Sequence, residues 1–113
     1  MELKLFGISH KTANLEMRES FVINDDHYSY MKNLLETKFA GEIDSIFVLT
    51  TCNRTEVYSY CRGEDSHQQF FKLIYKYLGC ELDITKNFYQ FSGIAAFKHM
   101  CSVASGIESR IIG

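Results

Sequence analysis

Short apolar runs alternate with amphipathic stretches along most of the chain, a pattern that predicts strands and helices in turn. The compact apolar runs predict four strands, at residues 3–9, 45–49, 55–61 and 88–91. Apolar residues that recur near helical spacing predict helices over residues 25–39 and 65–78, followed by a last helix that starts at Ser92 and Gly93. The segment 15–21 is short and mixed, and we expect no more than a helical turn there.

The predicted order of elements is strand, helix, strand, strand, helix, strand and a final helix. This order matches the split βαβ, ferredoxin-like arrangement, in which an antiparallel sheet carries helices on one face. The predicted fold class is therefore α+β, in a single domain over residues 1–113. The strand at 45–49 lies at a sheet edge in that topology, yet it is apolar at nearly every position. We therefore expect another part of a larger protein to pack on it.

The last helix carries an apolar stripe that we expect to face the core, made of Ile94, Phe97, Cys101 and Ala104. His99 lies about 140° around the helix from Ile94, at 3.6 residues per turn, which takes it off that stripe. The tail over residues 106–113 is apolar but short, and the sequence suggests no partner for it.

Composition limits the possible partners and the compartment. A formal net charge of −2 argues against strong stand-alone binding to nucleic acid, DNA in particular, but allows a small contact with an RNA end. Met1 leads into a segment without an apolar signal region, and no stretch approaches the roughly 20 apolar residues of a membrane span. These features favour a cytoplasmic protein that makes no membrane contact and keeps its four cysteines as free thiols.

Candidate chemistry gathers at the polar corner between the second and third predicted strands. Cys52 supplies a thiol there, and the thiolate form of cysteine is a nucleophile. Arg54, two residues later, supplies a planar set of donors that fits a carboxylate. These residues favour covalent catalysis on an anionic acyl substrate. A plain hairpin turn with a half-buried cysteine fits the same spacing.

The other cysteines are weaker candidates for a nucleophile. Cys61 ends a predicted strand, Cys80 follows a helix, and Cys101 falls on the apolar stripe of the last helix. A small metal site would need His99, Cys101 and a third cysteine, and this set is too thin to predict a bound metal.

Two of the four histidines are candidates for the site. His99 is a possible general base or positioning group near Cys52, and an ordinary surface histidine is the alternative. His10 lies in the loop after the first strand and is a candidate substrate contact. His27 and His67 lie at helix starts, where we expect them to be solvated.

Three stretches of the chain resemble glutamyl-tRNA reductase, the enzyme that opens tetrapyrrole (haem) synthesis from glutamate. The most specific stretch is Thr51-Cys52-Asn53-Arg54-Thr55-Glu56. The other two are Gly7-Ile8-Ser9-His10-Lys11-Thr12-Ala13, and His99 together with Val103-Ala104-Ser105-Gly106-Ile107-Glu108-Ser109. They occur in the order of the family and span essentially the whole chain. The departures from the family pattern, such as Asn14 where proline is usual, affect loops and surface.

The resemblance implies an oxidoreductase that uses NADPH to reduce glutamyl-tRNA to glutamate-1-semialdehyde through a cysteine thioester. Cys52 would be the nucleophile, and His99 would orient the substrate or move a proton near its carbonyl. Arg54 would bind the substrate carboxylate. Other polar residues of the matched stretches would hydrogen-bond the glutamyl group, namely Thr51, Asn53 and Ser109.

Members of the family are long proteins with a catalytic domain, a dinucleotide-binding domain and a dimerising helix. The resemblance therefore implies that residues 1–113 are the catalytic domain of a homodimeric enzyme, and that NADPH binds a part outside this chain. In agreement, the sequence contains no G-x-G-x-x-G and no P-loop. We expect no net reduction by this chain alone. The residues by themselves also allow a non-catalytic ferredoxin-like module that binds a ligand or regulates.

Overall fold

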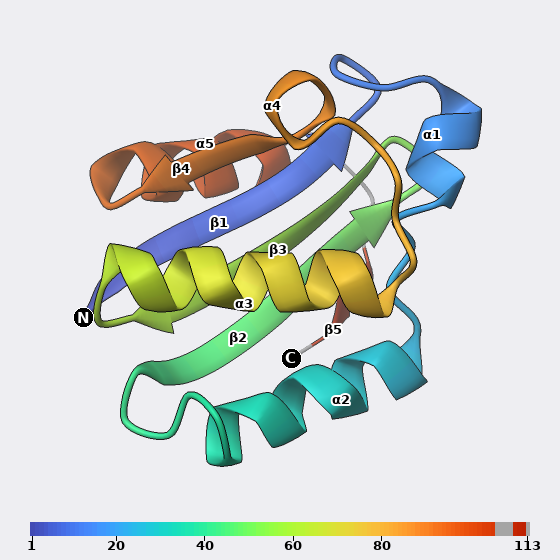
Figure 1. Ribbon diagram of the computed structural model, residues 1–113. Helices are drawn as coiled ribbons and strands as arrows, with labels where there is room; N and C mark the ends of the chain where they lie inside the picture. Colours follow the sequence, from blue (N-terminus) through green and yellow to red (C-terminus); the bar gives the residue numbers. More distant parts are fainter. Residues whose placement is uncertain (106–109, 113) are drawn as a thin grey trace.

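The computed structural model describes residues 1–105 and 110–112, and its elements alternate much as the hydrophobic pattern predicts (Figure 1). In chain order the elements are β1 (Glu2–Ser9), α1 (Leu15–Glu19), α2 (Asp25–Glu36), β2 (Ile43–Thr51), β3 (Arg54–Cys61), α3 (Glu64–Tyr77), α4 (Ile84–Asn87), β4 (Tyr89–Ser92), α5 (Ile94–Ala104) and β5 (Arg110–Ile112). The short elements α4 and β5 were not predicted. Over the described residues, none of the helices is long and apolar enough to cross a membrane.

Within the described part of the chain, five strands form one sheet in the order β4-β1-β3-β2-β5, and each neighbouring pair is antiparallel. The first four strands have the order of the ferredoxin-like split βαβ, so the predicted α+β fold class is confirmed. The register pairs Arg54 of β3 with Ser9 of β1 on one side and with Thr51 of β2 on the other. The ends of these three strands therefore meet at the polar corner that the sequence analysis singled out.

The position of β2 explains why its sequence is apolar at nearly every residue. Val48 belongs to the core on one face of the sheet, and Leu49 belongs to the core on the other face. The outer edge of β2 pairs with β5, which places residues 110–112 beside Val48, Leu49 and Thr50. The expectation that the C-terminal tail has no partner was therefore wrong, because part of that tail supplies the strand that packs on β2.

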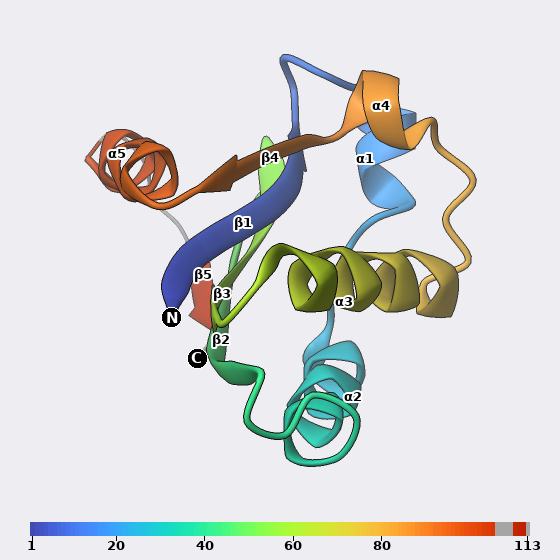
Figure 2. The same cartoon turned by 60° about the vertical axis from the view of Figure 1, so that its left-hand side comes forward.

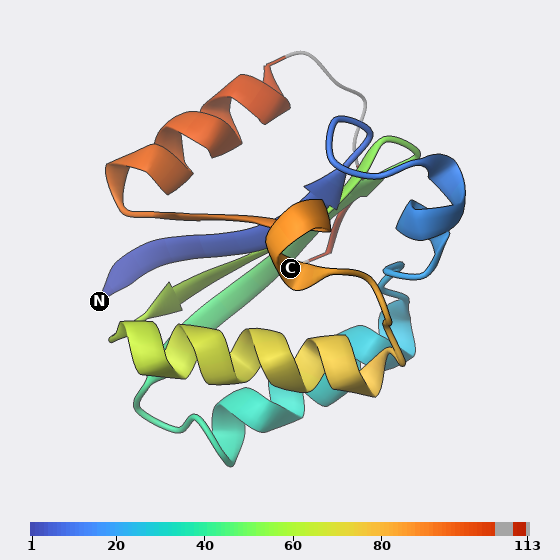
Figure 3. The ribbon, with the colours of Figure 1, turned by 45° about the horizontal axis from the view of Figure 1, so that its top comes forward.

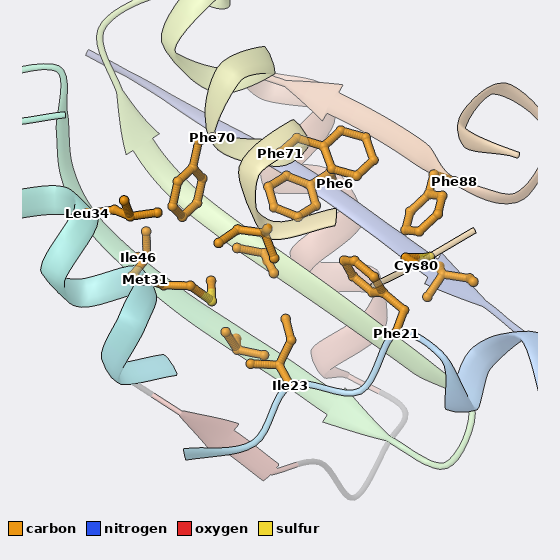
Figure 4. Close-up of a cluster of buried hydrophobic side chains, with 14 of the residues drawn as sticks. Phe6, Phe21, Ile23, Met31, Leu34, Ile46, Phe70, Phe71, Cys80 and Phe88 are labelled. Atoms are coloured by element: carbon orange, nitrogen blue, oxygen red, sulfur yellow. The ribbon is translucent and has the colours of Figure 1, made fainter. Parts of the chain in front are cut away.

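Helices α2 and α3 cover one face of the sheet and bury an aromatic core (Figures 1 and 4). Phe6 of β1 stacks on Phe71 of α3, with ring centroids 4.4 Å apart, and meets Phe70 edge-on at 6.0 Å. Met31 and Leu34 complete this core from α2. Aromatic side chains bury more apolar area than most others, so this face supplies much of the hydrophobic stabilisation.

His67 was expected to be solvated, but it is buried against the aromatic core, with an exposed fraction of 1%. Its ring lies 5.8 Å from that of Phe6, and its Nε2 lies 2.9 Å from Oε1 of Gln90. α3 begins at Glu64, and helical spacing then puts His67 on the same face as Phe70, Phe71 and Ile74. Burial lowers the pKa of the imidazole, which favours its neutral form.

Helix α5 lies on the opposite face of the sheet from α2 and α3 (Figure 2). The prediction of its buried stripe was wrong. Ile94 is 74% exposed and Phe97 is 54% exposed, and Cys101 and Ala104 are exposed as well. The helix instead buries Ala96 and Val103, and packs Met100 against the sheet. Hydrophobicity alone favours the larger side chains, but small ones let the helix lie over a sheet face that carries a buried polar group.

Candidate functional site

The polar corner is a two-residue connection, Cys52 and Asn53, between the paired residues Thr51 and Arg54. The amide of Asn53 donates to Oγ1 of Thr51 at 3.0 Å, which fixes the turn from inside. The amide of His10 donates to the carbonyl oxygen of Asn53 at 2.8 Å. The loop after β1 is thereby attached to the corner, and Figure 3 shows the two segments side by side.

Cys52, the predicted nucleophile, is exposed at this corner. It lines a hollow of about 250 Å³ between the corner and α1, here called the thiol hollow. The hollow is lined by Leu15, Arg18, Glu19, Val22, Thr51, Cys52, Arg54 and Thr55. The sequence did not identify the α1 side of this hollow, because nothing in the short, mixed segment signals which strands it will approach.

A second hollow of about 400 Å³ lies on the α5 side of the sheet, here called the imidazole hollow. It is lined by Ser9, Lys11, Thr12, Arg54, Tyr89, Phe91, His99, Ser102 and Val103. Arg54 lines both hollows, whereas Cys52 lines only the first and His99 only the second. The structure thus places the two predicted catalytic side chains at different hollows, with Arg54 at both.

His99 faces the sheet, and the side chain it meets is the carboxylate of Glu56. Nε2 of His99 lies 2.5 Å from Oε2 of Glu56. The imidazole also lies against two aromatic rings of β4, with its centroid 5.3 Å from that of Tyr89 and 4.9 Å from that of Phe91. His99 is therefore held between a carboxylate and an aromatic wall, rather than at an open surface position.

Glu56 is fully buried, with an exposed fraction of 0%, and it gathers hydrogen bonds from three elements. Nη1 of Arg54 donates to Oε2 at 3.4 Å, and the hydroxyl of Tyr89 donates to the same oxygen. The hydroxyl of Tyr58 donates to Oε1 at 2.8 Å. A buried charge is costly unless it is paired and hydrogen-bonded, and these contacts meet both conditions.

The two tyrosines act as permanent donors to this carboxylate. Burial, followed by the nearby negative charge of Glu56, raises the pKa of Tyr58 well above its ordinary value. The same two causes raise the pKa of Tyr89. Both hydroxyls therefore keep their protons throughout the range in which proteins function.

Glu56 belongs to the quoted motif, but sequence reasoning gave it no role. A signal was available, because Glu56 and Tyr58 are two residues apart on a strand and so share one face of the sheet. That shared face made Glu56 a candidate for burial, and a buried carboxylate needs partners. Its partners Tyr89 of β4 and His99 of α5 could not be predicted from the sequence, because they come from distant parts of the chain.

The remaining predicted site residues occupy simple positions. Thr51 and Asn53 form the turn, and the side chain of His10 is exposed beside it. Ser109 lies outside the described residues. Nε of Arg54 is buried and has no hydrogen-bond partner among the described residues, so the guanidinium retains a free donor. Across the same residues, no three His, Cys, Asp or Glu side chains lie together in a way that would hold a metal ion.

Fold and site together define a class: an α+β domain of ferredoxin-like topology with a thiol at a hairpin corner and an arginine held by a buried carboxylate. Residues 6–113 match the family model described as the N-terminal domain of glutamyl-tRNAGlu reductase. The chain therefore belongs to the glutamyl-tRNA reductase family, in the N-terminal domain of its members.

Individual relatives agree with the family match. The chain is 36% identical to glutamyl-tRNA reductase of Shewanella sp. (strain MR-7) and 32% identical to that of Prochlorococcus marinus (strain MIT 9211), each over 100% of this chain and 26% of the relative. The solved structure of glutamyl-tRNA reductase from Methanopyrus kandleri superimposes with a TM-score of 0.66 at 26% identity, covering 92% of this chain and 22% of that one. The chain thus spans about a quarter of the length of these relatives.

Proposed function

We propose that this chain carries the glutamyl-accepting site of a glutamyl-tRNA reductase, with Cys52 as the nucleophile. The observation that carries the proposal is the position of Cys52: an exposed thiol on a fixed turn, in a hollow shared with Arg54. Loops held by a rigid scaffold are common sites of catalysis, and this turn is held by strands on both sides and by the loop after β1.

The proposed step is a transfer of the glutamyl group from tRNA to sulfur. The thiolate of Cys52 attacks the ester carbonyl, a carbon–sulfur bond forms and the carbon–oxygen bond to the tRNA ribose breaks. The proton lost by the thiol is balanced by the proton gained by the released ribose hydroxyl. Covalent catalysis of this kind divides one difficult reaction into two easier ones, because a thioester accepts hydride more readily than an ester does.

Arg54 is proposed to bind the side-chain carboxylate of the glutamyl group. Its position at both hollows supports this role, because the guanidinium donors that Glu56 does not bind can meet an incoming carboxylate. Glutamine would leave the guanidinium donors that Glu56 does not bind without a carboxylate, a loss of about 1–3 kcal/mol or more. Thr51, Asn53, His10 and Ser109 are proposed to contact the rest of the glutamyl group.

His99 is proposed to orient the substrate or move a proton at the imidazole hollow. The contact between its Nε2 and Glu56 supports this role, since it leaves Nδ1 as the ring nitrogen available to a substrate or water. The two hollows on either side of Arg54 would then receive different parts of the glutamyl ester.

NADPH, the reductant that family membership implies, would supply hydride to the thioester. The described strands pair only in antiparallel fashion, so these residues do not form the parallel βαβ unit that cradles a dinucleotide. We therefore derive no reduction step from this chain. The activity proposed for residues 1–113 is glutamyl transfer, and glutamyl-tRNA is the partner it requires.

The test is transfer of labelled glutamate from glutamyl-tRNA to protein, compared between Cys52→Ser and Cys101→Ser. Cys101 is the matched control, because it is the second exposed cysteine among the described residues. We expect label on the wild-type protein and on Cys101→Ser, and only background on Cys52→Ser. Full labelling of Cys52→Ser would refute the nucleophile assignment.

A non-catalytic ligand-binding module makes a different prediction for the same two thiols. Such a module requires no special reactivity at the corner, so an alkylating reagent would modify Cys52 and Cys101 at similar rates. Selective modification of Cys52, measured by mass spectrometry of the peptides, is the result that the proposed function requires.

A further inference from the structure

We propose that Glu56 is a positioning residue that holds Arg54 and His99 through one buried oxygen atom, an inference that rests on the proposed function. Oε2 of Glu56 accepts a hydrogen bond from Nη1 of Arg54 at 3.4 Å and lies 2.5 Å from Nε2 of His99. Both of these partners line the imidazole hollow, whereas Glu56 itself is fully buried beneath them. Glu56 therefore acts on the substrate only through other side chains.

The cost of burying this carboxylate argues for such a role. Replacing a buried ion pair by well-packed apolar residues is often neutral or stabilising, so folding alone does not call for a charge at this position. The neighbours on the same face of the sheet, Leu5, Leu49 and Tyr58, belong to an apolar cluster that a larger hydrophobic residue would extend. The free-energy cost of burying this charge is explained by its role in holding Arg54 and His99 in place.

The two carboxylate oxygens of Glu56 have different partners, and this difference supports the inference. Oε1 is occupied by the hydroxyl of Tyr58, which does not line the hollow. Oε2 is shared by Arg54, His99 and Tyr89, all of which do. Oε1 thus bonds to a side chain of its own strand away from the hollow, whereas Oε2 holds the side chains that form the wall of the hollow.

Two consequences follow for the partners. Because Nη1 of Arg54 is committed to Glu56, the rest of the guanidinium is presented in one fixed orientation to a substrate carboxylate. Because Nε2 of His99 faces a carboxylate, this nitrogen carries a proton and Nδ1 is the nitrogen left to the hollow. Losing the charge of Glu56 would weaken both constraints at once.

The decisive variant is Glu56→Gln, which keeps the shape of the side chain but removes its charge. Its amide nitrogen can face Tyr58, whose hydroxyl also accepts, so one oxygen still points toward Arg54 and His99. The control is Tyr58→Phe, which removes one hydrogen bond from Oε1 and leaves the Oε2 contacts intact. Both variants are made in the full-length protein and compared by the rate of glutamyl transfer and by the unfolding midpoint.

We expect Glu56→Gln to lower the second-order rate of glutamyl transfer by at least about tenfold, and Tyr58→Phe by less than about threefold. The ¹⁵N resonances of His99 should report a proton on Nε2 in the wild type and a changed tautomer balance in Glu56→Gln. Should Glu56→Gln fail to fold, Tyr89→Phe replaces it, because it removes a donor from Oε2. Tyr89→Phe should then lose more activity than Tyr58→Phe.

Provided that the wild type is labelled at Cys52, two results would overturn the inference and leave the proposed function intact. One is a rate of glutamyl transfer by Glu56→Gln within about threefold of the wild-type rate. The other is an equal loss of rate in Tyr58→Phe, which affects Oε1, and in Tyr89→Phe, which affects Oε2. If the wild type takes no label from glutamyl-tRNA, it is the proposed function that fails. The tautomer of His99 still tests in that case whether Glu56 positions the ring.

Discussion

The two faces of the sheet are built on opposite principles. The face under α2 and α3 is closed by stacked and edge-on aromatic rings, among them Phe6, Phe70 and Phe71. The face under α5 has a smaller apolar cluster, and in the same layer it buries Glu56 with its polar partners. The aromatic core and the buried carboxylate with its partners thus lie on opposite faces of one sheet, and Figure 2 shows the helices that cover each face.

This separation has a simple physical basis. Side chains on a strand alternate between the two faces, so β3 can send Val57 into the aromatic core and Glu56 and Tyr58 into the polar layer. One rigid strand therefore serves both layers. The aromatic core holds the strand in place, and the strand in turn fixes the carboxylate that pairs with Arg54 and His99.

The largest expected difference between the faces concerns stability. Phe71→Ala removes a buried ring stacked on Phe6 and should lower the free energy of unfolding by about 3–5 kcal/mol. Phe97→Ala, on the exposed side of α5, should change it by no more than about 0.5 kcal/mol. Urea unfolding of the two variants measures both. Similar losses would mean that α5 uses its predicted apolar stripe after all.

An intermediate effect on stability and on glutamyl transfer is expected at Gly7, where β1 lies close against Glu56. Gly7 of β1 lies opposite Glu56, and an added Cβ would approach Cγ of Glu56 and the carbonyl oxygen of Thr55, each at 2.9 Å. Gly7→Ala should therefore cost about 1–3 kcal/mol and also slow glutamyl transfer, because it displaces the carboxylate.

Gly63→Ala is the control for this substitution, since an added methyl group there meets nothing within 4 Å. Gly63 is the N-cap residue of α3, so we expect a loss below about 1 kcal/mol and normal glutamyl transfer. If Gly7→Ala behaves like Gly63→Ala in both assays, the close approach of Gly7 to Glu56 has no energetic importance.

The smallest expected effect is a pH dependence from the aromatic face. Burial lowers the pKa of His67 in the folded state, so the unfolded chain binds the proton more readily. The contribution of neutral His67 to the free energy of unfolding is complete above the pKa of histidine in the unfolded chain, about 6.5, and is lost as the pH falls below that value. The free energy of unfolding should therefore decrease between about pH 7 and pH 5, and His67→Gln should decrease less.

Urea titrations at the two pH values measure this difference. The two proteins differ only at residue 67, so subtracting one pH dependence from the other isolates the contribution of His67. An equal decrease in the wild type and in His67→Gln would show that this ring is not held neutral by its burial.

The sequence alone determined the main elements and the location of the thiol. Apolar runs at strand spacing and amphipathic stretches at helical spacing gave the ferredoxin-like order, because these periodicities are local properties of the chain. The polar corner with Cys52 and Arg54 was visible for the same reason, since it is one continuous stretch between two strands.

Only the tertiary structure decided which residues surround that corner and how α5 sits on the sheet. Local hydrophobicity favoured Ile94 and Phe97 as the buried stripe, yet Ala96, His99 and Val103 face the sheet. In that layer the charge of Glu56 is paired with donors from β4 and α5, contacts that hydrophobicity does not predict. The partners of this buried charge are distant in sequence and close only in the folded chain, so no pattern of neighbouring residues predicts the pairing.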